Sequence, residues 1–374
     1  MKLRIDRVKP GMFLTKSVYL NGNSMPLIVI KDGETKELTE TEIFFLKNKG
    51  IKNLYVNFEL PKVGSVTEET EELAEEILFA NDYGNIVKVA ELLTDDILNN
   101  TPYSYDLTSY FTQNEDLYNH SVHTASFALA IIKSMNDDEG ISFTADINDY
   151  LEISKACLLH DIGKNIDEND LKKFQNEIVR RDKFNSSYFP EADLNCFNEI
   201  KPESYPIYSW SKIAGEDTIS SLVKTSILIQ NENDEKTGPL HFNIGQLTVK
   251  NKKAALFAKM INTCSYFDDL LYHVPTSEVV EKIKQDVSDR KVDPLTGTLL
   301  LRYIPIYPVG TKVILSNGLD AVVIRTNPNY PDRPVISVMI NGVATEFDLL
   351  TNNNVTITEI NTRGLDFLKY GKQK

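Results

Sequence analysis

A histidine and an aspartate stand side by side at positions 160 and 161, directly after the apolar residues of ACLL. Imidazole and carboxylate groups are ligands of divalent metals, and in helical bundles such ligands converge from several helices. Gly163 then allows a sharp exit of the chain, and Lys164 could reach a phosphate or a metal-bound water. The stretch LLHDIGK is therefore either part of a metal site or only the end of a helix.

A second group of candidate ligands lies upstream, in NEDLYNHSVH. Asp116 and His120 are four residues apart, so on a helix they share one face, and His123 lies near that face. A single His-Asp pair is common by chance, and a histidine at a helix end is often a cap on the last carbonyl groups. The acidic-xxx-His segment together with LLHDIGK is more specific than either part alone.

The elements that must position these residues are helices. From about residue 69 to 286 the apolar side chains follow a helical spacing. The segments are EELAEEILFA, IVKVAELLTDDIL, HSVHTASFALAIIKSM, INDYLEISKACLLHDI, WSKIAGEDTISSLVKTSILI, KAALFAKMINTCSYFDDLL and SEVVEKIKQDV. The intervening stretch 165–209 is long and polar, which is typical of a variable loop region. We predict a helical domain over residues 69–290, with LLHDIGK at one end of the bundle.

Both flanks of this region have the pattern of strands. Residues 1–60 contain short β-branched runs separated by turn signals, and LTETEIFFLKNKGI predicts one helix that starts at a threonine and ends at Gly50. The polar stretch 61–68 is predicted to be a linker. Residues 300–360 place the pairs Asn317-Gly318 and Asn341-Gly342 between alternating apolar runs, which is a strong hairpin signal. The predicted fold class is mainly α, with a small N-terminal α+β module and a small C-terminal β extension.

Charge and composition exclude several classes of protein. Of the 374 residues, 40 are Lys or Arg and 54 are Asp or Glu, so the net charge of -14 disfavours binding to a nucleic acid polymer. The charged N-terminus lacks the apolar core of a secretion signal, and no run approaches the roughly 18 apolar residues of a membrane span. We expect a cytoplasmic protein. Cys157, Cys196 and Cys264 have no CxxC spacing, so we expect reduced and mostly buried thiols.

Four segments, in order and spacing, resemble the HD-GYP branch of the HD-domain phosphohydrolases: NEDLYNHSVHTA, CLLHDIGK, ILIQNENDEKTGPL and LFAKMINTCSYFDDLL. The flanks agree, because KPGMFLTKSVY with LTETEIFFLKNKGIKNLYV resembles the N-terminal module often attached to these proteins. YPVGTKVILSNGLDAVVI with RPVISV resembles their C-terminal extension. The resemblance covers nearly the whole chain. It implies an HD-type bundle that holds two or three iron or manganese ions and cleaves cyclic di-GMP.

The resemblance implies a role for five retained residues. Asp116 falls where the family often has an acidic ligand, and His120 falls on its first histidine. His160 and Asp161 fall on the His-Asp pair that gives the family its name, so Asp161 is also a candidate catalytic residue. Lys164 falls on the lysine that contacts the substrate phosphate and is both a catalytic and a substrate-binding candidate.

Four further ligand positions of the family are replaced in this chain. The replacing residues are Tyr205, Gln230, Asn231 and Ser265, whose side chains bind such metals poorly. The Gly-Tyr-Pro signature is reduced to Gly238-Pro239, which we keep as substrate-binding candidates. A bridged metal pair lowers the pKa of a shared water toward roughly 7, and each metal needs several fixed ligands. At most four ligands remain, so a second metal has no place.

Neighbouring residues could rebuild part of the lost site. The candidates are Glu203, Glu232, Asp234, Asp268 and Asp269. For Asp268 we expect instead a structural hydrogen bond at a helix surface. His241 and His273 fall outside the family's ligand positions and are expected on the surface or in packing, and His123 is expected to be structural.

Some ligand positions of the family are retained and others are replaced, so the expected function is that of a degenerate HD-GYP-like protein. The leading hypothesis is binding of cyclic di-GMP or a related cyclic dinucleotide, or scaffolding of other signalling proteins, with lost or much reduced phosphodiesterase activity. The alternative is an active metal-dependent cyclic di-GMP phosphodiesterase with a reduced or relocated metal site. A third hypothesis is hydrolysis of a different phosphoester with one metal. We expect at most one divalent metal, iron or manganese, and none tightly bound.

Overall fold

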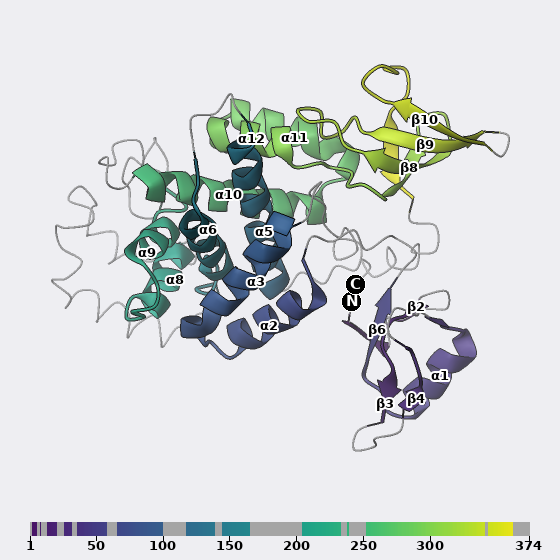
Figure 1. Cartoon of the computed structure of the whole chain (residues 1–374), viewed down its shortest axis with the longest axis horizontal. Coiled ribbons are helices and arrows are strands. Elements are labelled where there is room, and N and C mark those ends of the chain that lie inside the picture. The colour runs from purple at the N-terminus through teal and green to yellow at the C-terminus, as the bar shows by residue number, and fades with distance from the viewer. Residues whose placement is uncertain are drawn as a thin grey trace.

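The computed structural model describes residues 2–5, 8, 13–20, 26–31, 36–57, 66–99, 117–138, 144–164, 204–232, 238, 252–340 and 343–361. Within these residues the chain is mainly helical, with small sheets at both ends (Figure 1). The predicted fold class, a mainly α chain with an N-terminal α+β unit and a C-terminal region of strands, is confirmed.

The N-terminal unit combines short strands with one helix. Its four-stranded sheet has the order β1-β6-β2-β5, and β3 pairs with β4. The elements are β1 (Lys2–Arg4), β2 (Phe13–Leu14), β3 (Val18–Tyr19), β4 (Pro26–Ile28), β5 (Lys36–Glu37), α1 (Glu40–Asn48) and β6 (Asn53–Asn57). Helix α1 starts at Thr39, which forms a capping box with Glu42, and the chain leaves the helix through Gly50 at a φ of 77°. Both predicted ends of this helix are thus confirmed.

The central region is a bundle of helices. They are α2 (Glu68–Phe79), α3 (Ile86–Asn99), α5 (Leu117–Asn136), α6 (Ile147–Leu159), α8 (Tyr205–Ile213), α9 (Ser221–Leu228), α10 (Lys252–His273), α11 (Thr276–Ser288) and α12 (Pro294–Tyr303), with a short 3-10 turn η2 (Tyr83–Asn85) before α3. Helix α5 packs against α6 and α10, and α6 also packs against α3 and α9. The buried residues of α3 recur every three to four positions, as one apolar face of a helix requires.

Two details of the bundle differ from the sequence prediction. The stretch WSKIAGEDTISSLVKTSILI contains a break, because α8 ends at Ile213 and Ser220 caps the new helix α9. Helix α8 begins at Tyr205, inside the predicted loop 165–209, of which residues 165–203 lie outside the described residues. Pro206 in its first turn is a helix-start signal.

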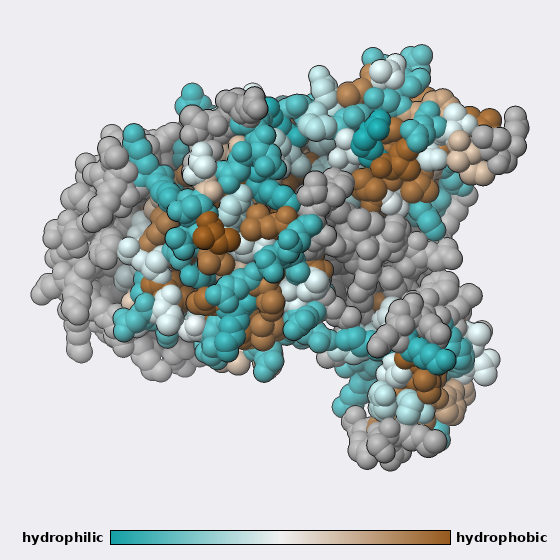
Figure 2. Space-filling model, in the orientation of Figure 1, coloured by the Kyte–Doolittle hydropathy of each residue, from teal (hydrophilic) through white to brown (hydrophobic). Residues whose placement is uncertain are grey.

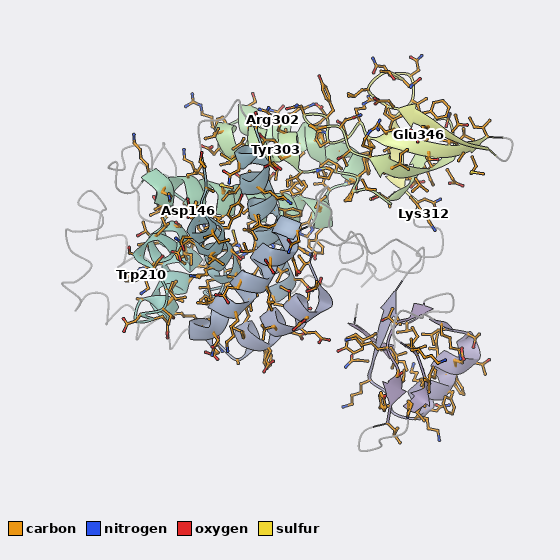
Figure 3. All side chains as sticks on the ribbon, viewed as in Figure 1. Asp146, Trp210, Arg302, Tyr303, Lys312 and Glu346 are labelled. Carbon is orange, nitrogen blue, oxygen red and sulfur yellow. The ribbon has the colours of Figure 1, made fainter. Side chains whose placement is uncertain are left out.

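Helix α12 was not predicted, and it extends the helical region past residue 290 to Tyr303. Asp293 caps the helix and Pro294 occupies its first position, so local start signals are present in the sequence. Figure 3 labels Arg302 and Tyr303 at the end of this helix. Tyr303 donates a hydrogen bond of 2.8 Å to the Asp138 carboxylate, and Arg302 pairs with the same group. These contacts anchor α12 to the end of α5.

The C-terminal strands form one antiparallel sheet with the order β10-β9-β8-β7-β11. They are β7 (Lys312–Leu315), β8 (Asp320–Arg325), β9 (Val335–Ile340), β10 (Val343–Asp348) and β11 (Ile357–Ile360). Gly318 turns the first hairpin at a φ of 81°, and Ile340 pairs directly with Val343 in the second. Both predicted hairpins are confirmed in their strand pairing.

The hydrophobic core is divided between two clusters. One lies entirely in the N-terminal unit, between Ile5 and Val56. The other runs through the helical bundle and continues into the C-terminal sheet. Figure 2 shows polar and apolar side chains interspersed over the helices, and a group of apolar ones on the C-terminal sheet. Val322 and Met339 of this sheet are exposed. Among the described residues, no helix is both long and apolar enough to cross a bilayer.

Candidate metal centre

The His-Asp pair lies where helix α6 ends in the interior of the bundle. Asp146 starts this helix with a capping box to Asp149, the helix ends at Leu159, and His160 is the cap residue. The side chains of His160 and Asp161 are both fully buried. The carbonyl oxygen of His160 accepts hydrogen bonds from Ser209 Oγ at 2.7 Å and from Gln230 Nε2 at 2.9 Å. Side chains of α8 and of the turn after α9 therefore satisfy the open end of α6.

Gly163 brings α8 against this turn. A Cβ atom at position 163 would lie 2.4 Å from Ser209 N, 2.5 Å from Tyr205 O and 2.7 Å from Tyr208 Cβ. The amide of Gly163 also donates to Ser209 Oγ at 2.9 Å. Gly163 is therefore required for close approach of two backbones. The sequence predicted that Gly163 allows a sharp exit of the chain from the helix. Gly163 is not among the glycines with positive φ, so the structure explains this glycine by the close packing of α8.

The ring of His160 is held by its own helix. Its Nδ1 atom donates to the carbonyl of Cys157 at 2.6 Å, which is the helix-end contact expected for a capping histidine. Burial lowers the pKa of His160 to about 4, so the ring is neutral at physiological pH. With the proton on Nδ1, the lone pair is on Nε2, which has no hydrogen-bond partner among the described residues.

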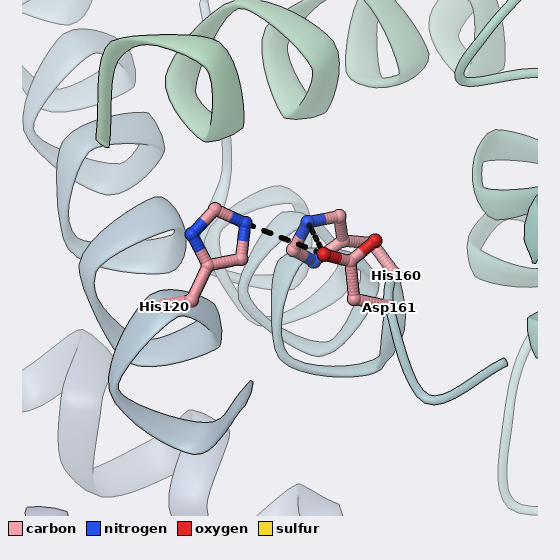
Figure 4. Close-up of side chains that lie close together, drawn as sticks. All are labelled: His120, His160 and Asp161. Carbon is pink, nitrogen blue, oxygen red and sulfur yellow. Dashed lines mark ion pairs between the residues drawn. The ribbon is translucent and has the colours of Figure 1, made fainter. Parts of the chain in front are cut away.

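His120 comes from helix α5 and faces the same point (Figure 4). Its Nε2 atom lies 3.3 Å from Asp161 Oδ2 and 3.0 Å from Ser265 Oγ. Its Nδ1 atom lies 2.7 Å from Asp268 Oδ2. Burial acts to lower the pKa of His120, but the hydrogen bond to Asp268 and the negative charges of Asp161 and Asp268 outweigh it and raise this pKa to about 10.

Asp161 is the carboxylate at the centre of the cluster. Its Oδ2 atom lies 3.3 Å from Nε2 of both His120 and His160, and the Lys164 ammonium contacts it as an ion pair. Burial acts to raise the pKa of Asp161, but these neighbours hold it well below its usual range. Neither carboxylate oxygen makes a hydrogen bond within the described part of the chain. Asp161 is thus a buried anion held by nearby charge.

Together, His120, His160 and Asp161 form a group that could hold a metal ion, because their ligand atoms all lie within 4.8 Å of one another. Two imidazole nitrogens and a carboxylate suit iron, manganese or zinc. Asp116, the fourth retained ligand position, lies outside the described residues. The structure therefore brings together three of the four residues that the resemblance retains as ligands.

The four replaced ligand positions have other contacts. Gln230 donates its amide to the His160 carbonyl, and Asn231 Oδ1 accepts from the Asn262 amide at 3.3 Å. Ser265 is hydrogen-bonded with His120 Nε2. Burial and the nearby charge of Asp161 raise the pKa of the Tyr205 hydroxyl. A phenol that stays protonated and neutral amides are weak ligands for a hard or borderline cation.

Lys164 lies at the margin of the cluster. Its side chain is 39% exposed, and its Nζ atom lies 5.0 Å from the centroid of the Tyr205 ring. Gly238 lies against the segment after α9, since an added Cβ would be 2.4 Å from Asn231 O and 2.6 Å from Glu232 Oε1. Pro239 is outside the described residues, as are Glu203, Asp234, Cys196 and His241.

Asp268 corrects one prediction. It was expected at a helix surface, but it is fully buried and its carboxylate contacts both His120 and His123. The physical reason is that α10 packs on α5 with this face inward. Cys264 and Leu271, on the same face of α10, are buried as well, so this helical spacing could have indicated the burial. Asp269, the next residue, is partly exposed and its Oδ1 lies 3.7 Å from His120 Nδ1.

No protein-family model matches the chain, and no curated protein matches it. Among solved structures, the fold is similar to "Bd1817, a HDG"Y"P protein from Bdellovibrio bacteriovorus", with 15% sequence identity and a TM-score of 0.43. The match covers 80% of this chain and 97% of that chain. At this level of similarity no residue role is transferred between the two proteins.

Proposed function

We propose that this chain is an HD-GYP-like protein of cyclic-dinucleotide signalling, which acts by binding and has little or no phosphodiesterase activity. The observation that carries the proposal is the meeting of His120, His160 and Asp161 beside positions whose side chains serve other contacts. The order and spacing of the sequence motifs support the family, and the side-chain geometry supports a site for one divalent metal.

The three donors fit one metal ion. Buried polar atoms in proteins are nearly always hydrogen-bonded, yet His160 Nε2 and Asp161 Oδ1 have no such partner among the described residues, and Asp161 Oδ2 has only its contacts with Lys164 and the two histidine rings. A divalent cation would satisfy these atoms, and the donor set suits iron or manganese. Such an ion would supply Lewis acidity and an activated water when bound. His120 and His160 would each bind the ion through Nε2, and Asp161 would supply the negative charge.

Among the described residues, the four replaced positions would give a second metal no ligand of the kind that the family resemblance implies. Tyr205, Gln230, Asn231 and Ser265 offer only neutral oxygen or nitrogen atoms, and the two amides already contact other groups. The activation of a water shared by two metals requires several fixed ligands on each ion. On this argument the chain retains binding but loses most of the hydrolysis that the family resemblance implies.

The ligand would meet the protein at Lys164. This ammonium group is partly exposed, so it can also contact a phosphate oxygen while it lies beside Asp161. Cyclic di-GMP carries two phosphodiester groups, which suit a lysine beside a metal ion. Gly238 and Pro239 remain proposed as substrate-binding residues.

One observation favours a second candidate function, an active phosphodiesterase with a reduced metal site. Nε2 of both His120 and His160 lies 3.3 Å from the same oxygen of Asp161, so one metal would have three protein ligands and open positions. Lys164 would then bind the phosphate of the substrate.

Metal analysis and calorimetry test these functions. We expect anaerobically purified protein to take up at most one Mn²⁺ per chain and to bind cyclic di-GMP in isothermal titration. Lys164→Ala should weaken dinucleotide binding, whereas His273→Ala, an exposed residue at the end of α10, should not. Absence of dinucleotide binding would remove the sensor role and leave a scaffold. Hydrolysis of cyclic di-GMP in added Mn²⁺ would favour the second candidate.

A further inference from the structure

Asp268 is a fully buried carboxylate between two histidines of one helix. Its Oδ2 atom lies 2.7 Å from Nδ1 of His120, and its Oδ1 atom lies 3.0 Å from Nδ1 of His123. Each oxygen thus serves one ring, and the two rings are three residues apart on α5. The carboxylate comes from α10, so this contact also joins the two helices.

The contact decides which nitrogen of His120 carries a lone pair. A carboxylate only accepts hydrogen bonds, so Nδ1 of His120 must be the donor. In the neutral ring Nε2 then has the lone pair, and Nε2 is the atom that faces Asp161 at 3.3 Å. His160 reaches the same state through a different acceptor, the carbonyl of Cys157. Two rings on two helices therefore present the same nitrogen to one point.

We propose that Asp268 is a positioning residue of the metal site, which holds the ring of His120 with Nε2 toward the metal, and that His123 in turn holds the Asp268 carboxylate. The inference rests on the proposed function, since it assumes that His120, His160 and Asp161 bind a metal. Asp268 does not bind the metal itself. Histidine ligands in metalloproteins usually donate their second N–H to a carboxylate or carbonyl group, which fixes the ring and strengthens the ligand.

A purely structural role for Asp268 is less consistent with its surroundings. Burial of a carboxylate costs free energy, and an apolar residue of similar size would often stabilise a helix contact equally well. Phe267 and Cys264, its neighbours on α10, fill the interface with apolar groups. The use of a carboxylate at this one position is explained by the two imidazole rings that it orients.

The test compares Mn²⁺ dissociation constants of full-length variants. Asp268→Asn keeps the size of the side chain but presents an amide that can donate to Nδ1 and so favours the wrong form of His120. We expect its Mn²⁺ affinity to fall by about 10-fold to 100-fold. One control should bind Mn²⁺ within about twofold of the wild type on the same reasoning. It is Asp286→Asn, which removes a buried carboxylate on α11.

The outcomes separate this inference from the proposed function. If the wild type binds Mn²⁺ and Asp268→Asn binds it equally well, the positioning role is refuted and the metal site stands. If the wild type binds no metal, the metal site and the positioning role are both refuted, and the isothermal titration with cyclic di-GMP still tests the proposed binding function separately. Should Asp268→Asn fail to fold, His123→Phe is the second variant, because it keeps an aromatic ring but removes the donor to Asp268. Its Mn²⁺ affinity should fall several-fold, and wild-type affinity would overturn the inference.

Discussion

Replacement of Gly163 by alanine tests how closely α8 packs against the turn that carries Asp161. The added Cβ would meet three atoms of α8 at 2.4, 2.5 and 2.7 Å, whereas ordinary contact begins at 3.4 Å. Two of these atoms belong to the backbone and the third is a Cβ, so a change of rotamer cannot relieve the overlap. The helix or the turn must move by several tenths of an ångström.

The cost of this movement has two parts. Overpacking of a well-packed interior costs about 1–3 kcal/mol. The movement also strains the hydrogen bonds through Ser209 Oγ, which link Gly163 N at 2.9 Å and His160 O at 2.7 Å, and each is worth about 1 kcal/mol. We therefore expect Gly163→Ala to lower the free energy of unfolding by about 2–4 kcal/mol.

Gly215→Ala is the matched control. A Cβ at Gly215 would have no atom within 4 Å, and this residue is not among the glycines with positive φ. Its substitution should change the free energy of unfolding by less than about 1 kcal/mol, in the stabilising direction. Urea unfolding of the full chain, followed by far-ultraviolet circular dichroism, measures both variants. Equal unfolding midpoints for the two alanine variants would refute the argument from close approach.

Three further predictions follow from local contacts. Thr39→Ala removes the capping box of α1 and should destabilise the N-terminal unit by about 1 kcal/mol, as measured by hydrogen exchange in α1; unchanged protection would contradict this. Burial acts to raise the pKa of Asp286, but Lys282, Tyr266 and Lys291 outweigh it and lower this pKa. Asp286→Asn should therefore destabilise the protein at neutral pH. The difference in stability should shrink as pH falls below about 4, because a lowered folded-state pKa stabilises only the ionised form. A difference independent of pH would exclude this carboxylate as the cause. Finally, a metal bound to His120 must replace a proton of this ring, because its pKa is raised to about 10. The affinity for Mn²⁺ should therefore increase up to about tenfold per pH unit between about pH 7 and pH 9. An affinity that does not change with pH would show that His120 is no ligand.

Much of the local structure could be predicted because its causes lie within a few residues. Thr39 and Gly50 mark the two ends of α1, and Asn317-Gly318 marks a hairpin, because capping and turn formation depend on neighbouring backbone groups. Helix α12 was missed although Asp293 and Pro294 carried the start signal. The residues 291–299 were left unassigned between the predicted helical domain and the predicted β extension, so this error came from interpretation and not from missing local information.

The candidate site was predicted only in part. The residue types and spacing of His120, His160 and Asp161 were sufficient to name them as candidate ligands, and the structure brings all three together. The contacts of the replaced positions could not be read from the sequence. Gln230 donates to the carbonyl of His160 at the end of α6, 70 residues away in the chain, and no local pattern indicates that partner.

The sequence by itself determined which chemical groups are present at this site: two imidazoles, a carboxylate and a lysine. Only the tertiary structure decided that Asp268 is buried against His120 and that Gly163 must lack a side chain. The physical reason is range. Caps and turns are set by contacts between near neighbours in the chain, whereas the burial and the pKa of a side chain depend on which distant helix packs against it.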